Sequence, residues 1–324
     1  MATYRKALPQ MSRDLFITDG GIETDIIFHE GFKLPDFAAF VLLDDDKGYK
    51  TLRKYFQKQA ELARDYGVGL VFETATWRSN PERGLKLGFS SSALVDINRR
   101  AVELLSEIRS EYENGKTKIV ISGCLGPRGN SYFPTKAIMM SAEEAQEYHA
   151  VQIGTFSETE ADMVTAITTP YVEEGIGITR AAQFYDMPVV ISFVVETDGT
   201  LPMGQTLQDA IQQVDEATGN GPAYYMINCA HPSHFTTALS GGEPWLDRIH
   251  GIRGNASKKS HAELDFSVKL DEGDISELGQ DYLTLLRSLK NLNVLGGCCG
   301  TDIRHIEEIC KVALVYRDNT GIAV

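Results

Sequence analysis

The sequence lacks any apolar run approaching the roughly 20 residues that a membrane-spanning helix needs, and its first residues lack the apolar core of a secretory signal. We therefore expect a cytoplasmic protein with no membrane role. Basic residues are also scarce, because 31 Lys and Arg stand against 45 Asp and Glu, which gives a formal net charge of −14. This surplus of negative charge opposes attraction to phosphate backbones, so it argues against nucleic acid as a partner.

Cysteine is infrequent, with five in 324 residues. An odd number spread thinly over a long chain favours reduced thiols over a disulfide framework. Cys310 follows a helical pattern of apolar residues, and we interpret both it and Cys124 as core residues, because a free cysteine packs as a small hydrophobe.

The other three thiols stand in distinctive surroundings. Cys229 lies in Ile-Asn-Cys-Ala, and the adjacent Cys298 and Cys299 lie in Gly-Gly-Cys-Cys-Gly-Thr. Flanking glycines remove side-chain bulk and let a ligand or metal approach the backbone. Three thiolates are also what a catalytic Zn²⁺ needs if it keeps a fourth position open for substrate.

Short apolar runs alternate with longer segments of helical period, which predicts an α/β fold. The expected strands are 15–19, 69–74, 119–124, 163–168, 189–194, 224–229, 249–255 and 293–296. The expected helices are 52–66, 93–112, 142–158, 171–186, 207–218, 275–289 and 302–316. Eight such units close into a (β/α)8 TIM barrel, and no linker divides the chain, so we expect a single domain over residues 1–324. The alternative is an open doubly wound sheet, but the segment 18–24 lacks the spacing of a dinucleotide-binding loop.

The barrel constrains the thiols. Cys229 ends the sixth strand and the Cys298–Cys299 pair follows the eighth, so all three are expected at the C-terminal rim, where such barrels build their active sites. Asp19, Thr74, Ser122, Asn228 and Asn255 are expected on the same rim. Asn228 and Asn255 either orient the metal ligands, supply an oxygen ligand when substrate is absent, or bond loop backbone. His231 and His234 also lie near Cys229, and we interpret them as capping or packing residues.

A set of motifs extends nearly from end to end of the chain. They are Asp-Gly-Gly-x-x-Thr (19–24), Thr-Ala-Thr (74–76), Gly-Pro-Arg-Gly (126–129), Asn-Cys (228–229), Asn-Ala (255–256) and Gly-Gly-Cys-Cys-Gly-Thr (296–301) with His305 and Ile306. With these motifs the chain resembles the zinc-dependent homocysteine S-methyltransferase family. The resemblance implies Zn²⁺ on Cys229, Cys298 and Cys299, and an amino-thiol substrate near Asp19, Gly20, Gly21, Thr74, Asn228 and Asn255.

The implied reaction is transfer of a methyl group from a small sulfonium donor, S-methylmethionine or S-adenosylmethionine, to homocysteine or a close analogue, giving methionine. A sulfonium releases a neutral thioether and needs no general acid, so no catalytic residue beyond the metal ligands is expected. Betaine is disfavoured as a donor, because the betaine enzymes place a tyrosine where this chain has Arg78. Arg78 and Arg128 are either substrate-carboxylate contacts or solvated surface residues.

One departure from the family bears on the acceptor. Family members usually carry a Glu for the homocysteine amino group at the end of the fourth strand, whereas this chain has Ile167 followed by Thr168. Glu73, Glu23 and Asp162 are candidates to replace that carboxylate. The alternatives are a methyltransferase for a different thiol and a non-catalytic protein that binds zinc or thiol metabolites. A redox role for Cys298 and Cys299 is a third alternative, which leaves Cys229 without a part.

Overall fold

The barrel is closed. In the computed structural model, which describes residues 2–265 and 269–321, eight parallel strands pair in chain order and β8 pairs with β1. The strands are β1 (Phe16–Ile17), β2 (Gly69–Glu73), β3 (Ile119–Leu125), β4 (Met163–Thr169), β5 (Val189–Val194), β6 (Tyr224–Asn228), β7 (Ile249–Gly254) and β8 (Val294–Gly297). Phe16 pairs with both Gly69 and Val294. The predicted TIM barrel is therefore confirmed, and the alternative of an open sheet is wrong.

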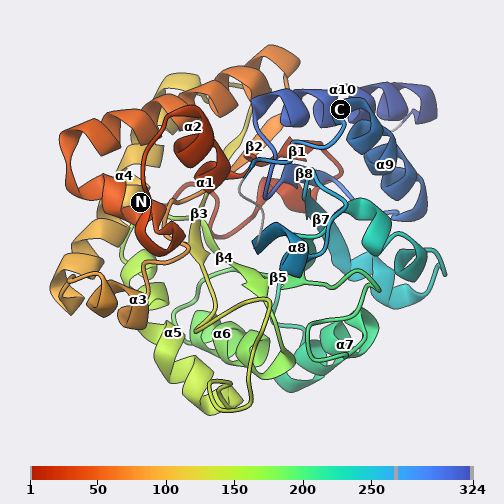
Figure 1. The fold of residues 1–324 in the computed structure, drawn as a ribbon. Coiled ribbons are helices and arrows are strands. Elements are labelled where there is room, and N and C mark those ends of the chain that lie inside the picture. Colours follow the sequence, from red (N-terminus) through yellow and green to blue (C-terminus); the bar gives the residue numbers. More distant parts are fainter. Residues whose placement is uncertain (1, 266–268, 322–324) are drawn as a thin grey trace.

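The longer helices form an outer ring around the strands (Figure 1). They are α2 (Asp46–Tyr66), α4 (Ser91–Tyr112), α5 (Ala142–Ser157), α6 (Val172–Phe184), α7 (Leu207–Thr218), α9 (Ile275–Ser288) and α10 (Ile303–Thr320). The shorter α-helices are α1 (Ile22–Thr24), α3 (Pro81–Lys86) and α8 (His261–Asp265). The helices expected from residues 142 and 302 begin where predicted, with Ser141 and Asp302 as the N-caps of α5 and α10. The helix predicted from residue 52 begins earlier, because the Asp45 side chain accepts a hydrogen bond from Gly48 N and caps α2.

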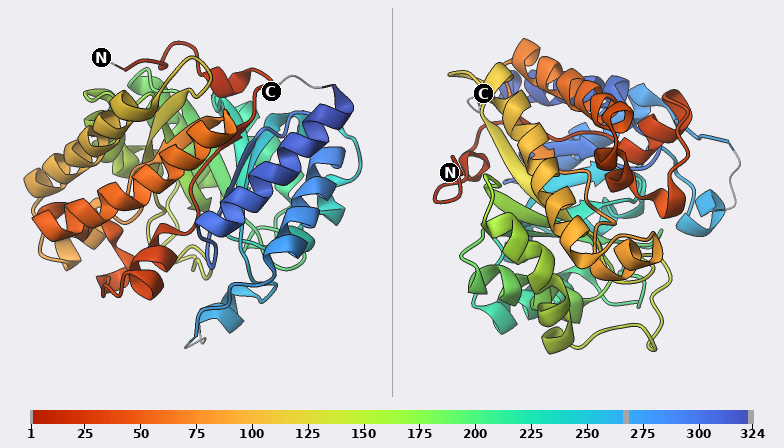
Figure 2. Two further views of the ribbon diagram at one scale, coloured as in Figure 1. Left: turned by 90° about the horizontal axis from the view of Figure 1, so that it is seen from above. Right: turned by 90° about the vertical axis from the view of Figure 1, so that its left-hand side faces the viewer.

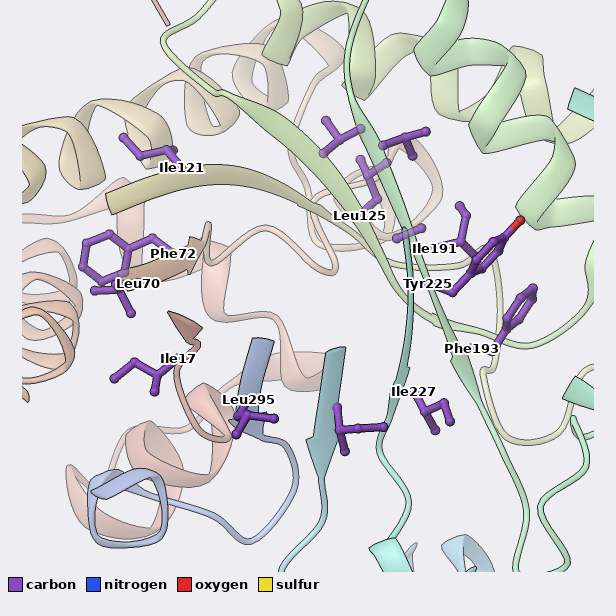
Figure 3. Packing of buried hydrophobic residues seen from close by; sticks show 14 of the residues in the cluster. Ile17, Leu70, Phe72, Ile121, Leu125, Ile191, Phe193, Tyr225, Ile227 and Leu295 are labelled. Atoms are coloured by element: carbon purple, nitrogen blue, oxygen red, sulfur yellow. The ribbon is translucent and has the colours of Figure 1, made fainter. Parts of the chain in front are cut away.

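Residues that alternate along the strands point to opposite faces. Those facing outward pack against the helices, as Figure 3 shows for Ile17, Leu70 and Leu295 among others. Those facing inward form a second apolar cluster that fills one end of the barrel, with Phe16, Val71, Val120, Met163, Val190, Tyr224 and Val294. Two residues further along their strands come buried polar side chains, including Glu73, Ser122 and Thr165. The interior therefore becomes polar towards the C-terminal ends of the strands.

The two ends of the barrel differ in their loops. The left view of Figure 2 shows α8 at one end of the molecule and the N-terminal segment at the other. At the N-terminal end of the strands, Arg5 donates hydrogen bonds to Ser157 O and Ala161 O. The single domain over 1–324 stays a prediction. In the described residues, no helix has both the length and the apolar character that a membrane crossing requires.

Candidate metal centre

The three thiols that the sequence separates by up to 70 positions meet at the C-terminal rim. Cys229 follows the last residue of β6, and Cys298 follows the last residue of β8. The Sγ atoms of Cys229, Cys298 and Cys299 all lie within 4.8 Å of one another, and those of Cys229 and Cys299 are 3.4 Å apart. The other two cysteines, Cys124 and Cys310, are buried away from this cluster, as predicted.

The donor set fits a zinc ion. A tetrahedral site with Zn–S bonds of about 2.3 Å separates its sulfurs by about 3.8 Å, which the observed spacing allows with small side-chain adjustments. Cys229 is buried, Cys298 is half-buried and Cys299 is exposed, so the cluster faces solvent on one side. Three thiol ligands with one open side are the arrangement of a catalytic rather than a structural zinc site.

Asn255 ties together the two backbone segments that carry the thiols. Its Nδ2 donates to Cys229 O over 2.9 Å, and its Oδ1 accepts from Cys299 N over 3.0 Å. The side chain is 1% exposed, so water cannot replace it. Of the roles open from the sequence, Asn255 bonds loop backbone, and through that backbone it sets the separation of two thiols.

Asn228 connects the thiols to β4 and β5. Its Oδ1 accepts from Thr168 N at 2.9 Å and from Ser192 Oγ at 2.6 Å, which directs its Nδ2 towards Cys298 Sγ at 3.9 Å. Both Thr168 and Cys229 have positive φ angles, of 59° and 60°, which non-glycine residues rarely adopt. The backbone turns sharply at these strand ends, and Asn228 orients a thiol directly.

Glycines let the loop after β1 lie directly on the thiol loop. A Cβ at Gly21 would be 2.5 Å from Cys298 O, and a Cβ at Gly296 would be 1.8 Å from Thr18 Oγ1. The approach is held by hydrogen bonds from Gly21 N to both Thr301 O and Thr301 Oγ1, at 3.0 and 3.2 Å. The Asp-Gly-Gly motif is therefore packed against the Gly-Gly-Cys-Cys-Gly-Thr motif.

Beneath the thiols lies a buried group of charges. Arg253 at the end of β7 pairs with Asp19, with Nη2 and Oδ1 2.7 Å apart. Burial opposes the guanidinium charge, but Asp19 and Glu73 raise the pKa of Arg253 above its ordinary value. Hydrogen bonds from Cys229 and Cys299 lower the pKa of the Cys298 thiol, and the charge of Arg253 acts in the same direction. The centre therefore favours a thiolate at Cys298.

Several predicted site residues are occupied by contacts within the protein. Asp19 also accepts a hydrogen bond from Tyr55 OH at 3.0 Å. Thr74 Oγ1 lies 2.6 Å from Thr76 Oγ1 and accepts from Cys124 N at 2.8 Å, so it joins the ends of β2 and β3. His231 caps a short helix by accepting from Ser233 N, in agreement with its interpretation as a capping residue.

The two arginines differ from each other. Arg128 is a surface residue that pairs with the exposed Glu82 at 3.0 Å. Arg78 is half-buried, and its guanidinium lies 3.8 Å from the centroid of the Trp77 ring. Burial lowers the pKa of Arg78 to about 10. The expectation of a solvated surface arginine holds for Arg128 and not for Arg78.

Tyr132 is a site residue that the sequence did not indicate. It comes from the long segment between β3 and α5, and its OH lies 2.9 Å from Cys229 Sγ. Its ring stacks on His261 of α8, with centroids 4.2 Å apart. Loops that follow β3 and β7 thus meet over the thiols. No periodicity or motif marks either residue, because their contact depends on how two irregular loops fold.

Fold and site together define a (β/α)8-barrel protein with a three-thiol centre at its C-terminal rim. The family described as homocysteine S-methyltransferase matches residues 16–313, and the chain belongs to that family. The protein is accordingly an S-methyltransferase enzyme.

Individual relatives are distant. The homocysteine S-methyltransferase YbgG of Bacillus subtilis is 24% identical over 323 residues, covering 92% of this chain and 94% of the relative. The oxidized form of the homocysteine methyltransferase MmuM from Escherichia coli superposes with a TM-score of 0.73 at 16% identity, over 95% of this chain and 99% of that one. The metallated form of the same protein superposes with a TM-score of 0.72 at 17% identity, over 94% of this chain and 98% of that one. At these identities the solved structures show the shared fold.

Proposed function

We propose that the protein transfers a methyl group from a small sulfonium, S-methylmethionine or S-adenosylmethionine, to the thiol of homocysteine or a close analogue. Zn²⁺ is held by Cys229, Cys298 and Cys299. The single observation that carries the proposal is the gathering of these three Sγ atoms within 4.8 Å at the rim where barrel enzymes act. A zinc ion there would lower the pKa of an acceptor thiol at its open position, and the thiolate is the nucleophilic form.

The reaction balances without a general acid. A new bond forms between the acceptor sulfur and the methyl carbon as the bond from the donor sulfur breaks. The electron pair of the broken bond stays on the departing thioether, which is neutral, and the acceptor's proton passes to solvent. The chain's own part is alignment and exclusion of water. Asn228 and Asn255 fix the thiols, and Tyr132 covers Cys229.

Direct contact of the amino-thiol with Asp19, Gly20, Gly21 and Thr74 stays a prediction. Asn228 and Asn255 act in this proposal through the thiols that they orient. The side chain of Ile167, which is buried near the end of β4, offers no acceptor for an ammonium group. This residue favours one second candidate, methyl transfer to a thiol other than homocysteine.

The test is an activity screen on the purified zinc-loaded protein. Homocysteine and selenohomocysteine are each paired with S-methylmethionine, S-adenosylmethionine and betaine, and the methylated product is measured by mass spectrometry. We expect methionine from a sulfonium donor, none from betaine, and loss of turnover with a chelator that added Zn²⁺ reverses. Full turnover of metal-free protein would sink the mechanism. Tight zinc binding without transfer to any thiol is instead the result expected of a non-catalytic zinc or thiol-metabolite binding protein.

A further inference from the structure

Most acidic groups near the barrel axis are already engaged. Asp162 lies just before β4, at the opposite end from the thiols, where its Oδ2 is 2.8 Å from Arg109 Nη1. Asp19 is 2% exposed and is bonded to both Arg253 and Tyr55. Glu73 is 4% exposed within the barrel, and neither of its carboxylate oxygens has a hydrogen-bond partner among the described residues. Asp162 is therefore remote from the rim, Asp19 already has two side-chain partners, and the Glu73 oxygens are shielded from solvent inside the barrel.

Glu23 differs from these groups in place and in partners. It lies in α1 and is half-buried, and residues on both sides of it touch the thiol loop. The backbone of Gly21 lies against Cys298 O, and Thr24 Oγ1 accepts from Gly300 N at 3.1 Å. Within residues 2–265 and 269–321, the Glu23 carboxylate forms no hydrogen bond or ion pair with another residue. This carboxylate thus stands beside the metal centre without a cation.

Arg78 supplies the opposite charge on the neighbouring loop. Its guanidinium stacks on Trp77, whose Nε1 donates to Thr168 Oγ1 at 3.0 Å, so the arginine is held close to the end of β4. Arg78 Nη1 donates to Gly129 O at 3.2 Å, while the buried Nε has no hydrogen-bond partner in the described part of the chain. The charges of Tyr132 and Glu23 act on the pKa of Arg78, and the charge of Arg78 acts on the pKa of Glu23. Among the described residues, Glu23 and Arg78 nevertheless form no ion pair within 4.0 Å.

We propose that Glu23 and Arg78 together recognise the two charges of an α-amino-acid thiol whose sulfur sits at the three-cysteine centre. Glu23 accepts hydrogen bonds from the ammonium group, and Arg78 donates to the carboxylate. This assignment rests on the proposed function and deepens it, because it restricts the acceptor to thiols that carry both groups. It also explains how Ile167 is tolerated at the end of β4.

Burial and the neighbouring Cys298 and Asp19 charges raise the pKa of Glu23 to about 7. An ammonium group placed beside Glu23 would offset this unfavourable environment, because an opposite charge favours the ionised form. A cationic ligand would therefore stabilise the ionised form of Glu23.

The test measures thiol binding to the zinc-loaded protein by calorimetry, without a methyl donor. The ligands are homocysteine, 4-mercaptobutanoate, which lacks the ammonium group, and 3-aminopropanethiol, which lacks the carboxylate. A hydrogen bond to a charged group is worth about 10- to 100-fold in affinity, so we expect each analogue to bind more weakly than homocysteine by about that factor. Glu23→Gln should lower the affinity for homocysteine to that for 4-mercaptobutanoate. The affinity for 4-mercaptobutanoate should stay unchanged.

Arg78→Gln provides an independent test. This variant should bind homocysteine more weakly than wild type and should bind 3-aminopropanethiol with unchanged affinity. Glu30→Gln is the matched control, because Glu30 pairs with the exposed Lys54 away from the thiols. Zinc content and the unfolding midpoint are measured for every variant. Glu23→Gln protein that still prefers homocysteine over 4-mercaptobutanoate by the wild-type factor overturns the assignment. If the wild-type protein shows the expected binding preferences but forms no methylated product, the proposed function is overturned. The roles of Glu23 and Arg78 in binding the amino-acid thiol would then still stand.

Discussion

Asp19 and Arg253 form a buried ion pair that joins the loop after β1 to the end of β7, with Oδ1 and Nη2 2.7 Å apart. Arg253 also donates from Nε to Gly297 O at 3.1 Å, so the same guanidinium reaches the end of β8. Three strand ends are therefore held by one side chain directly beneath the thiols. The side chains of Asp19 and Arg253 are 2% and 6% exposed, so water cannot reach the ion pair without rearrangement of the loops.

Arg253→Met should destabilise the fold by about 3–5 kcal/mol, because it leaves the Asp19 carboxylate buried and unpaired. The loss is measured as the free energy of unfolding in urea. The double variant Asp19→Asn, Arg253→Met removes both charges and should recover part of it. Equal losses in the single and double variants would contradict a stabilising pair.

Cys298→Ala should abolish stoichiometric zinc and methyl transfer, because two thiols do not complete the donor set. Metal content by mass spectrometry and methionine formation check both effects. Cys310→Ala is the control, since Cys310 is a buried residue of α10 remote from the rim, and it should retain the metal. A Cys298→Ala protein that keeps one zinc per chain would refute the assigned ligands.

Asn255→Ala should weaken zinc binding by about 10- to 100-fold, the usual effect of removing a residue that orients metal ligands. The variant leaves Cys229 O and Cys299 N without their partner. Competition with a chromophoric chelator gives the affinity. Asn291→Ala, which removes a single exposed hydrogen bond to Asp247 O, should leave it unchanged.

Gly21→Ala should displace the thiol loop and lower zinc affinity, because the added Cβ would lie 2.5 Å from Cys298 O, a backbone atom. Gly115→Ala is matched in chemistry, and its Cβ would meet no atom within 4 Å. Chelator competition and thermal unfolding are measured for both. Identical behaviour of the two variants would show that the close approach of the loops is not required.

Glu73 predicts a pH dependence of stability. Burial raises its pKa from 4.5 to about 7, although Arg253 and the hydroxyls of Thr165 and Ser122 act in the opposite direction. Because the folded-state pKa lies above the unfolded value, the folded protein holds this proton more tightly. Its stabilising contribution is complete below pH 4.5 and is lost as the pH rises through 7.

Glu73→Gln keeps the side chain neutral at every pH and should remove the loss of stability that accompanies ionisation of Glu73. The variant is expected to gain stability relative to wild type between pH 5 and 8, by on the order of 3 kcal/mol at the upper end. Urea unfolding at several pH values gives the difference, with Glu30→Gln as the control. A constant difference between Glu73→Gln and wild type over this range would show that Glu73 does not titrate there.

The barrel and the meeting of the three thiols could be anticipated from the sequence for a physical reason. Parallel strands fully buried on both faces appear as continuous apolar runs, and the order of such runs fixes which ends share a rim. Cys229 and Cys298 directly follow two of these runs, so counting strands placed them correctly.

Contacts made by irregular segments could not be anticipated in this way. Tyr132 and His261 meet through two loops with no period, and Asp19 is engaged by Arg253, which is 234 positions away in the chain and carries no motif. Asp162 was a candidate for the rim although it precedes β4, and its contact with Arg109 places it at the other end. The α2 start was missed because its first turn contains Asp, Lys and Gly without apolar spacing.

The contact between Gly21 N and Thr301 O spans 280 residues and closes the ring between β1 and β8. Contacts of such sequence separation are late and slow events in folding, since the entropy of closing a long loop precedes any gain from them. Two of the three thiols directly follow β8, the last barrel strand in chain order. A metal held by the three thiols would therefore be captured only when the ring is complete, and its binding free energy would add to the closed state alone. During synthesis the three thiols cannot meet until β8 has joined β1.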